Sequence, residues 1–199
     1  NRYSVTQGSP ELHEALKKHL KHRKDLQAEH VLITSGVSGA LMLAILTVVC
    51  HDQEVVCPDP YFVMYKHLIH LAQGKPVFLD TYPDFIVTAD RLAKVITKNT
   101  KLVLLNSPGN PTGACIPADE VRRIADLARE HDLLLLSDEI YDHFVYDHPF
   151  CSIASIYDKT LLTGGFSKTY AMTGWRLCYM TGPHEIIEKM TMLQQYSFV

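Results

Sequence analysis

Short apolar runs alternate with longer mixed stretches along the whole chain, and this alternation predicts strands and helices in turn. Each short run is apolar at consecutive positions, as expected of strands that are buried on both faces of a mainly parallel sheet. The runs occupy residues 31–34, 54–57, 76–79, 102–105, 133–137, 161–164 and 177–180. The pattern therefore predicts a doubly wound α/β domain.

Proline marks the start of three expected helices, because its missing N–H would be unpaired in the first turn anyway. These helices cover residues 11–24, 61–71 and 118–131. A more apolar helix is expected to run to Val49, and the chain reaches Val199 within a helical pattern. Ligands of such sheets bind at the carboxyl ends of the strands. Asn106 and Asp138 follow strand ends directly, and Lys168 lies a few residues past another.

Composition narrows the class of protein. With 199 residues, of which 47% are hydrophobic and 21% charged, the chain can form one sizeable core. A formal charge of −3 gives no basic surface for nucleic acid. The longest apolar stretch, residues 40–50, is too short to cross a bilayer, and no leader opens the chain, so we expect neither membrane insertion nor secretion.

Five cysteines at wide spacing form no Cys-x-x-Cys pair, which favours a reducing cytoplasm over a disulfide framework. The 11 histidines include two pairs at helical spacing, His19 with His22 and His67 with His70. Neither pair has a clear third ligand nearby, so we interpret them as solvated helix faces and expect no metal site. The chain starts without methionine and stops inside a helical pattern, which is the appearance of a piece of a longer protein.

Lys168 lies in a segment without helical periodicity, among glycine, serine and threonine residues, with Arg176 eight positions later. A desolvated lysine in a tight turn is a nucleophile that can form an imine. Arg176 offers a permanent, bidentate charge for a phosphate. Each residue alone would be interpreted as a surface residue, but their spacing indicates an amine beside a phosphate, as in a site for pyridoxal phosphate (PLP).

Asp138 follows a run of leucines, so its carboxylate stands at the mouth of a buried strand and needs a cation there. A protonated pyridine nitrogen is such a cation; the alternative is a helix N-cap. Tyr141 and Asn110 are placed to donate hydrogen bonds to the phenolate oxygen of the same cofactor. The alternative for the Asn-Pro-Thr-Gly segment that contains Asn110 is an ordinary turn.

Residues 34–41 join a strand to the apolar helix through glycine and serine. Backbone N–H groups at a helix start bind phosphate well, and Ser38 can add a hydroxyl. The alternative is ordinary capping by Ser35. Phe62 is placed to stack on the pyridine ring, although an aromatic residue there is as often part of the core.

Three motifs, Asn-Pro-Thr-Gly, Ser-Asp-Glu-Ile-Tyr and Ser-Lys with Thr-Gly-Trp-Arg, occur in this order. Together they resemble the class I/II PLP-dependent aminotransferases of the aspartate aminotransferase superfamily (PLP fold type I). The resemblance runs from about Tyr3 to the last helix. It implies a three-layer α/β/α fold with a mainly parallel seven-stranded sheet. It also implies that residues 1–199 are the cofactor-binding large domain, with the small C-terminal domain absent from this chain.

The resemblance assigns roles by position. It makes Lys168 the Schiff-base lysine, which moves a proton between substrate Cα and cofactor C4′, and Asp138 the partner of the pyridinium. It places Asn110 and Tyr141 on the phenolate oxygen. The remaining cofactor contacts that it implies are Gly36, Val37, Ser38 and Arg176 on the phosphate, Phe62 on the ring, Ser167 beside the lysine, and Tyr3 reaching the phosphate of the neighbouring subunit in a homodimer.

Two features depart from the family pattern. Many relatives carry a phosphate-binding serine where this chain has Gly165. The family's arginine for the substrate α-carboxylate belongs to the small C-terminal domain, beyond Val199. We therefore expect the chain alone to bind PLP but to transaminate poorly.

The leading functional hypothesis is transfer of an amino group from an amino acid to a 2-oxo acid. The first alternative is a PLP-dependent C–S β-lyase, because both reactions begin with deprotonation of Cα. Some lyases carry histidine before Asn-Pro, whereas Gly109 here favours a transferase. The second alternative is a PLP-binding regulatory domain without turnover, against which the lack of a basic helix-turn-helix segment argues. The amino acid donor stays open.

Overall fold

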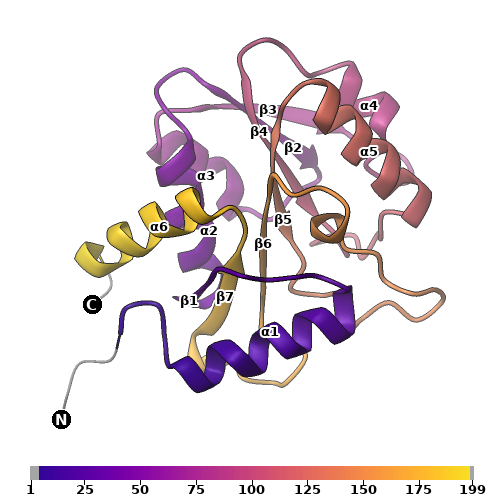
Figure 1. Cartoon of the computed structure of the whole chain (residues 1–199). Coiled ribbons are helices and arrows are strands. Elements are labelled where there is room, and N and C mark those ends of the chain that lie inside the picture. Colours follow the sequence, from indigo (N-terminus) through magenta and orange to yellow (C-terminus); the bar gives the residue numbers. More distant parts are fainter. Residues whose placement is uncertain (1–4, 198–199) are drawn as a thin grey trace.

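The computed structural model describes residues 5–197. Within them, one sheet runs through the molecule and helices cover both of its faces (Figure 1). The strands are β1 (Val31–Ser35), β2 (Glu54–Asp59), β3 (Lys75–Asp80), β4 (Thr100–Asn106), β5 (Leu134–Asp138), β6 (Thr160–Gly165) and β7 (Leu177–Thr181). The helices are α1 (Pro10–Lys24), α2 (Gly36–Val48), α3 (Met64–Leu71), α4 (Ala89–Ala93), α5 (Ala118–Glu130) and α6 (His184–Ser197), with short 3₁₀ turns η1 (Ile153–Ser155) and η2 (Thr173–Trp175).

The sheet has the strand order β1-β7-β6-β5-β4-β2-β3. Neighbouring strands are parallel except at β7, which is antiparallel to both β6 and β1. All seven expected strands are present, and the expected three-layer fold with a mainly parallel sheet is confirmed.

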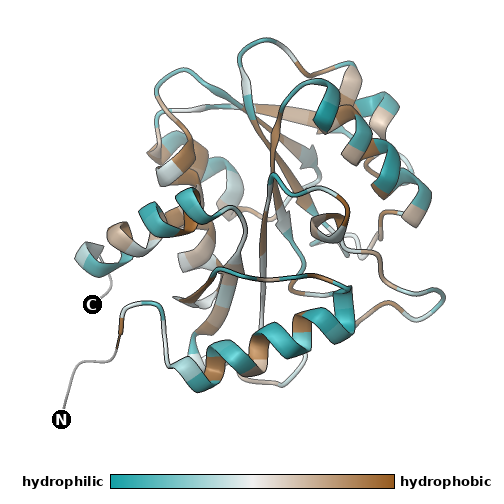
Figure 2. Ribbon diagram, viewed as in Figure 1, coloured by the Kyte–Doolittle hydropathy of each residue, from teal (hydrophilic) through white to brown (hydrophobic). Residues whose placement is uncertain are grey.

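Alternate residues of the central strands enter different halves of the core. In β5, Leu134 and Leu136 pack with α2 and α3 on one face, whereas Leu135 packs with α5 on the other. In β6, Leu161 joins the first of these clusters, and Leu162 packs with residues of α1. Figure 2 shows apolar colour along the strands and polar colour on parts of α1 and α5. Burial on both faces explains why the strand sequences are apolar at consecutive positions.

Local sequence explains most of the helix boundaries. Ser9 caps α1 by accepting a 3.2 Å hydrogen bond from the Leu12 N–H, and Asp25 ends the helix in the left-handed region at φ 51°. The expected start of α3 at residue 61 is wrong, since the helix begins at Met64. Tyr61 instead stacks on Phe78, with 5.0 Å between ring centroids. The five-residue helix α4 is not expected from the pattern, because one turn is too short to show a period.

Across residues 5–197, the helices lack the combination of length and apolar character that crossing a bilayer requires. All five cysteines are free thiols, and Cys57 and Cys178 are buried.

The strand order brings polar strand ends together. Asn106 at the end of β4 is in register with Asp138 at the end of β5, and Asp138 is in register with Thr163 of β6. The loop of residues 166–176 follows β6 and leads into β7. The turn between β1 and α2 contacts the end of this loop, because the Gly36 N–H donates a 2.9 Å hydrogen bond to the Arg176 carbonyl.

Candidate active site

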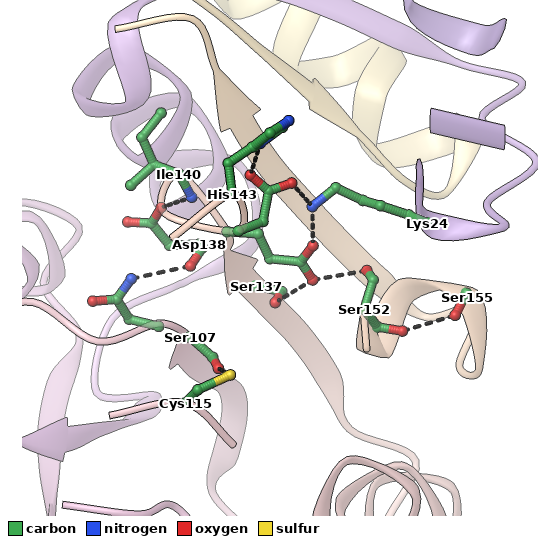
Figure 3. A network of polar contacts seen from close by, with 12 residues as sticks. Lys24, Ser107, Cys115, Ser137, Asp138, Ile140, His143, Ser152 and Ser155 are labelled. Atoms are coloured by element: carbon green, nitrogen blue, oxygen red, sulfur yellow. Dashed lines mark hydrogen bonds and ion pairs between the residues drawn. The ribbon is translucent and has the colours of Figure 1, made fainter. Parts of the chain in front are cut away.

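The Asp138 carboxylate is buried at the end of β5, with only 3% of the residue exposed. Its Oδ2 accepts a 2.8 Å hydrogen bond from the Tyr65 phenol. Its Oδ1 accepts one of 3.3 Å from the Ile140 N–H, which Figure 3 shows. No helix starts here among the described residues, so the N-cap alternative for Asp138 is wrong. Burial raises the pKa of Asp138 to about 6, against the opposing effect of the two hydrogen bonds. A cation bound beside this carboxyl group would therefore stabilise its ionised form.

Lys168 lies in the loop of residues 166–176 and lines the same cavity as Asp138. Its Nζ lies 5.8 Å from the centroid of the Tyr141 ring, so the ammonium is attracted to the face of that ring. Lys168 is exposed, however, so the expectation that this lysine is desolvated is wrong. The reason is that the loop runs over the surface beyond β6, where Tyr170 and Trp175 are exposed as well.

Asn106 connects the Asn-Pro-Thr-Gly loop to β5. Its side-chain N–H donates to the Asp138 carbonyl at 3.0 Å, and its Oδ1 accepts a 2.7 Å hydrogen bond from the Asn110 N–H. Asn110 lines the cavity together with Tyr141. The segment is also a turn, closed by a 2.8 Å hydrogen bond from the Gly113 N–H to the Gly109 carbonyl. The two interpretations of this motif are therefore compatible.

The first turn of α2 faces the guanidinium of Arg176. Gly36 has φ 69°, and a Cβ at this position would collide with the Arg176 guanidinium. Val37 and Ser38 line the cavity, as does Arg176, whose Nη1 donates a 3.0 Å hydrogen bond to the Thr173 carbonyl. The helix start and the arginine create a positive region suited to a phosphate. Gly36 serves by allowing the close approach, and the Ser35 side chain makes no capping hydrogen bond.

Phe62 and Ser167 also line the cavity. The Phe62 ring meets the Tyr65 ring edge to face, with 5.6 Å between centroids. Ser167 is buried, and its Oγ lies 4.0 Å from the Cys178 Sγ. A Cβ at Gly165 would collide with the same sulfur, so Cys178 occupies the space that a serine at 165 would need.

The cavity has a volume of about 190 Å³. Nine of the residues with expected roles line this cavity. Gly36 does not line it but lies against the Arg176 guanidinium. Those nine are Val37, Ser38, Phe62, Asn110, Asp138, Tyr141, Ser167, Lys168 and Arg176. Tyr3 lies outside the described residues. Four lining residues were given no site role by the sequence argument: Tyr65, Asn106, Ile140 and Thr173.

The sequence signals for these four residues differ. Asn106 was expected at this edge of the sheet, because it is a polar residue directly after an apolar run, but no contact was assigned to it. Tyr65 carries no such signal, since a tyrosine on an apolar helix face normally belongs to the core. A larger groove of about 680 Å³ lies near His30 and His184, but it contains none of the motif residues. Chemistry rather than volume therefore identifies the site.

Comparison with known proteins decides the family. The sequence profile of the family described as "Aminotransferase class I and II" matches residues 1–199. The chain belongs to this family. It is 39% identical over 204 residues to an aspartate aminotransferase of Pyrococcus abyssi, covering 98% of this chain and 52% of that protein. It is 38% identical over 204 residues to aromatic-amino-acid aminotransferase 2 of Thermococcus litoralis, again covering 98% and 52%.

Solved structures agree with this placement. The aspartate aminotransferase of Thermus thermophilus with maleate superimposes with a TM-score of 0.96 at 36% identity. That match covers 98% of this chain and 53% of the other. The chain thus spans about half the length of the relatives it matches.

Class I and II aminotransferases use PLP, and the described residues of this chain fit that cofactor. The fit rests on charge at three points. A buried carboxyl group with a raised pKa, that of Asp138, suits a pyridinium nitrogen. The start of α2 with Arg176 suits a phosphate, and Lys168 offers an amine to an aldehyde within the same cavity.

Proposed function

We propose that the protein is an aminotransferase that moves an amino group from an amino acid to a 2-oxo acid, with PLP attached to Lys168. The observation that supports this most strongly is the buried Asp138 carboxylate in a cavity lined also by Lys168 and Arg176. Bound PLP supplies an electron sink that acidifies the Cα–H bond of an amino acid and accepts its amino group.

Asp138 would hold the protonated ring nitrogen in this proposal. Burial raises the pKa of Asp138 in the free chain and so disfavours its ionised form. A bound cation would stabilise that ionised form. The Nζ of Lys168 would bind the cofactor covalently. The Lys168 amine would be the group that accepts the proton from substrate Cα and carries it to C4′.

The remaining lining residues would orient the cofactor. Asn110 and Tyr141 would donate hydrogen bonds to its phenolate oxygen, and Phe62 would pack against its ring. The N–H groups of the first turn of α2 and the Ser38 hydroxyl would bind the phosphate. Arg176 would add two charged hydrogen bonds, and Ser167 would contact the cofactor beside the lysine.

We further propose that residues 1–199 form the cofactor-binding large domain and that a further segment supplies the arginine for the substrate carboxylate. The share of the relatives that the chain spans supports this division. We also propose a cytoplasmic homodimer, in which Tyr3 reaches the phosphate of the neighbouring subunit. Exposed aromatic side chains beside the cavity, Tyr170 and Trp175, support such an interface.

An absorbance titration tests the attachment of PLP. The protein should acquire a visible band with PLP that borohydride reduction fixes covalently, and Lys168→Ala should abolish both. Lys159→Ala is the matched control, because Lys159 pairs with Asp132 at the surface and lies outside the cavity. A band that persists in Lys168→Ala contradicts the proposal.

A turnover assay on the full-length protein tests the reaction. Aspartate and aromatic amino acids should be assayed first with 2-oxoglutarate, because the relatives are named for these donors. Amino-group transfer requires the 2-oxo acid. Release of pyruvate and ammonia without it would identify a β-lyase instead, and PLP binding without either reaction would identify a regulatory domain.

A further inference from the structure

A buried lysine lies against the segment that carries Asp138 and Tyr141. Lys24 is the last residue of α1, and its side chain is 1% exposed. Its Nζ lies 2.5 Å from Oε2 of Glu139 and 2.6 Å from Oδ2 of Asp142. We name these three residues, Lys24, Glu139 and Asp142, the Lys24 cluster. Figure 3 shows Lys24 reaching toward the segment that follows Asp138.

Further contacts complete the Lys24 cluster. Oε1 of Glu139 accepts hydrogen bonds from the Ser137 hydroxyl at 3.0 Å and from the Ser152 hydroxyl at 2.8 Å. The other carboxylate, Asp142, faces Nδ1 of His143 through Oδ1 at 2.7 Å. The lysine also lies over the Phe150 ring, 4.8 Å from its centroid. Each buried charge therefore has several partners.

Residues of the Lys24 cluster alternate with residues of the cavity along the chain. Glu139 directly follows Asp138, and Asp142 directly follows Tyr141. Residues 139–142 lie beyond the end of β5 and outside any helix. The Glu139 N–H donates to the Thr163 carbonyl of β6 at 2.9 Å, and a turn links Asp142 to Glu139. Lys24 of α1, more than a hundred positions earlier in the chain, adds the side-chain contacts that fix this segment from the other side.

Charge links the cluster to Asp138 as well. The negative charge of Glu139 raises the pKa of Asp138, in addition to the larger effect of burial. Although burial alone lowers it, the two carboxylates raise the pKa of Lys24, which keeps the ammonium charged. Removing this cation would leave the Glu139 and Asp142 carboxylates without their counter-ion. The unbalanced charge of Glu139 next to Asp138 would then favour protonation of Asp138.

Stability alone is a weak reason for such a cluster. Burying an ion pair costs desolvation that its attraction only partly offsets, so a well-packed apolar group is often as stable. An apolar group in place of Lys24 could neither bind the Glu139 and Asp142 carboxylates nor balance the negative charge next to Asp138.

We propose that Lys24 is a positioning residue for the PLP site, which acts through Glu139 and Asp142 to hold Asp138 and Tyr141 and to offset the negative charge beside Asp138. The inference rests on the proposed function. The other titratable or charged groups that face these residues are Tyr65 of α3, Lys168 of the loop after β6, His19 and Arg23 of α1, His143, Cys115, Cys151 and Tyr179 of β7.

The experiment compares Lys24→Met, Lys24→Arg and Lys21→Met in the full-length protein. Lys21 lies on the same helix and pairs with Asp25 at the surface, so it is the matched control. For each variant, PLP affinity, the pH midpoint of the visible band and the unfolding temperature without PLP are measured. Lys24→Met should weaken PLP binding about tenfold, as expected for coupled neighbours. It should also move the midpoint upward, because the site becomes more negative.

The control variants should separate charge from packing. Lys24→Arg should retain most of the PLP affinity and the midpoint, and Lys21→Met should change neither. Glu139→Gln should move the midpoint downward. Lys24→Met combined with Glu139→Gln restores the net charge of the cluster and should return the midpoint toward that of the wild type, which keeps the test informative if Lys24→Met alone does not fold.

A purely structural role gives a different result. If Lys24→Met lowers the unfolding temperature but leaves PLP affinity and midpoint unchanged, the inference is overturned. The same holds if Glu139→Gln leaves the midpoint unchanged, or if adding it to Lys24→Met does not return the midpoint toward that of the wild type. A wild-type protein that acquires no visible band would instead overturn the proposed function, so the two failures are distinguishable.

Discussion

The Tyr65 phenol donates a 2.8 Å hydrogen bond to Oδ2 of Asp138, and both side chains are buried. Tyr65 belongs to α3, far from Asp138 in sequence, and it also meets the ring of Phe62. This hydrogen bond lowers the pKa of Asp138 against the larger opposite effect of burial. Tyr65 thereby favours the ionised carboxylate that a pyridinium nitrogen requires.

Replacement of Tyr65 by phenylalanine should weaken PLP binding and turnover about tenfold or more. The reason is that a hydrogen bond to a charged group contributes about 1.5–3 kcal/mol. Tyr157→Phe is the control, because its buried phenol donates to the Leu133 carbonyl away from the cavity. It should cost stability without changing the PLP dissociation constant. Equal PLP affinity in the wild type and Tyr65→Phe would contradict this role.

Asp138→Asn should stabilise the PLP-free protein at neutral and alkaline pH. Because burial raises the pKa of Asp138 from 3.8 to about 6, its ionisation in the folded state costs about 3 kcal/mol. This cost is absent below pH 3.8, grows as the pH rises toward 6 and is complete above it. In urea, the free energy of unfolding of the variant should therefore exceed that of the wild type at pH 8, and the difference should disappear toward pH 4. The same variant should bind PLP poorly, and a gap independent of pH would show that the cost lies elsewhere.

Gly36→Ala should disrupt the proposed phosphate site. The residue has φ 69°, and its new Cβ would collide with the Arg176 guanidinium. We expect an increase of about tenfold in the PLP dissociation constant, in addition to a strain of about 1–3 kcal/mol. Gly113→Ala is the matched control, since it has φ 74° but no atom within 4 Å of an added Cβ. Both variants should lose stability in urea, but PLP affinity should fall much further in Gly36→Ala.

The chain of residues 1–199 alone should bind PLP and turn over poorly. The cavity residues lie within it, whereas the proposed arginine for the substrate carboxylate does not. Loss of that positioning should lower turnover about a hundredfold or more relative to the full-length protein. Single-turnover kinetics of both proteins with aspartate provide the measurement. Full turnover by the short chain would show that its own residues bind the substrate carboxylate.

The sequence was sufficient for the sheet and for most of the cavity wall. Strands buried on both faces leave a consecutive apolar run, and Asp138 stands out because a charge directly follows such a run. Tyr65 was missed because its role depends on the packing of α3 against the end of β5, which leaves no local trace. The exposure of Lys168 was also missed, since the path of a loop over the surface is not encoded in its glycine content.

Helix starts show the same limit. The Pro-marked starts of α1 and α5 follow from local chemistry, and the structure has them within one residue of the expected positions. At α3 the aromatic residues Tyr61 and Phe62 continue the apolar pattern but precede the helix, with Tyr61 stacked on Phe78 and Phe62 against Tyr65. The pattern therefore placed the helix start too early.

The loop of residues 166–176 carries both Lys168 and Arg176, and its two ends are fixed where Gly165 pairs with Cys178 in the sheet. Its length therefore sets the separation of the two cations as firmly as its composition sets their identity. Solvent-facing side chains of this loop that belong neither to the cavity nor to the proposed interface can be exchanged one at a time, whereas a single inserted or deleted residue would displace amine and guanidinium together. For protein engineering, this segment is open to substitution but closed to changes in length.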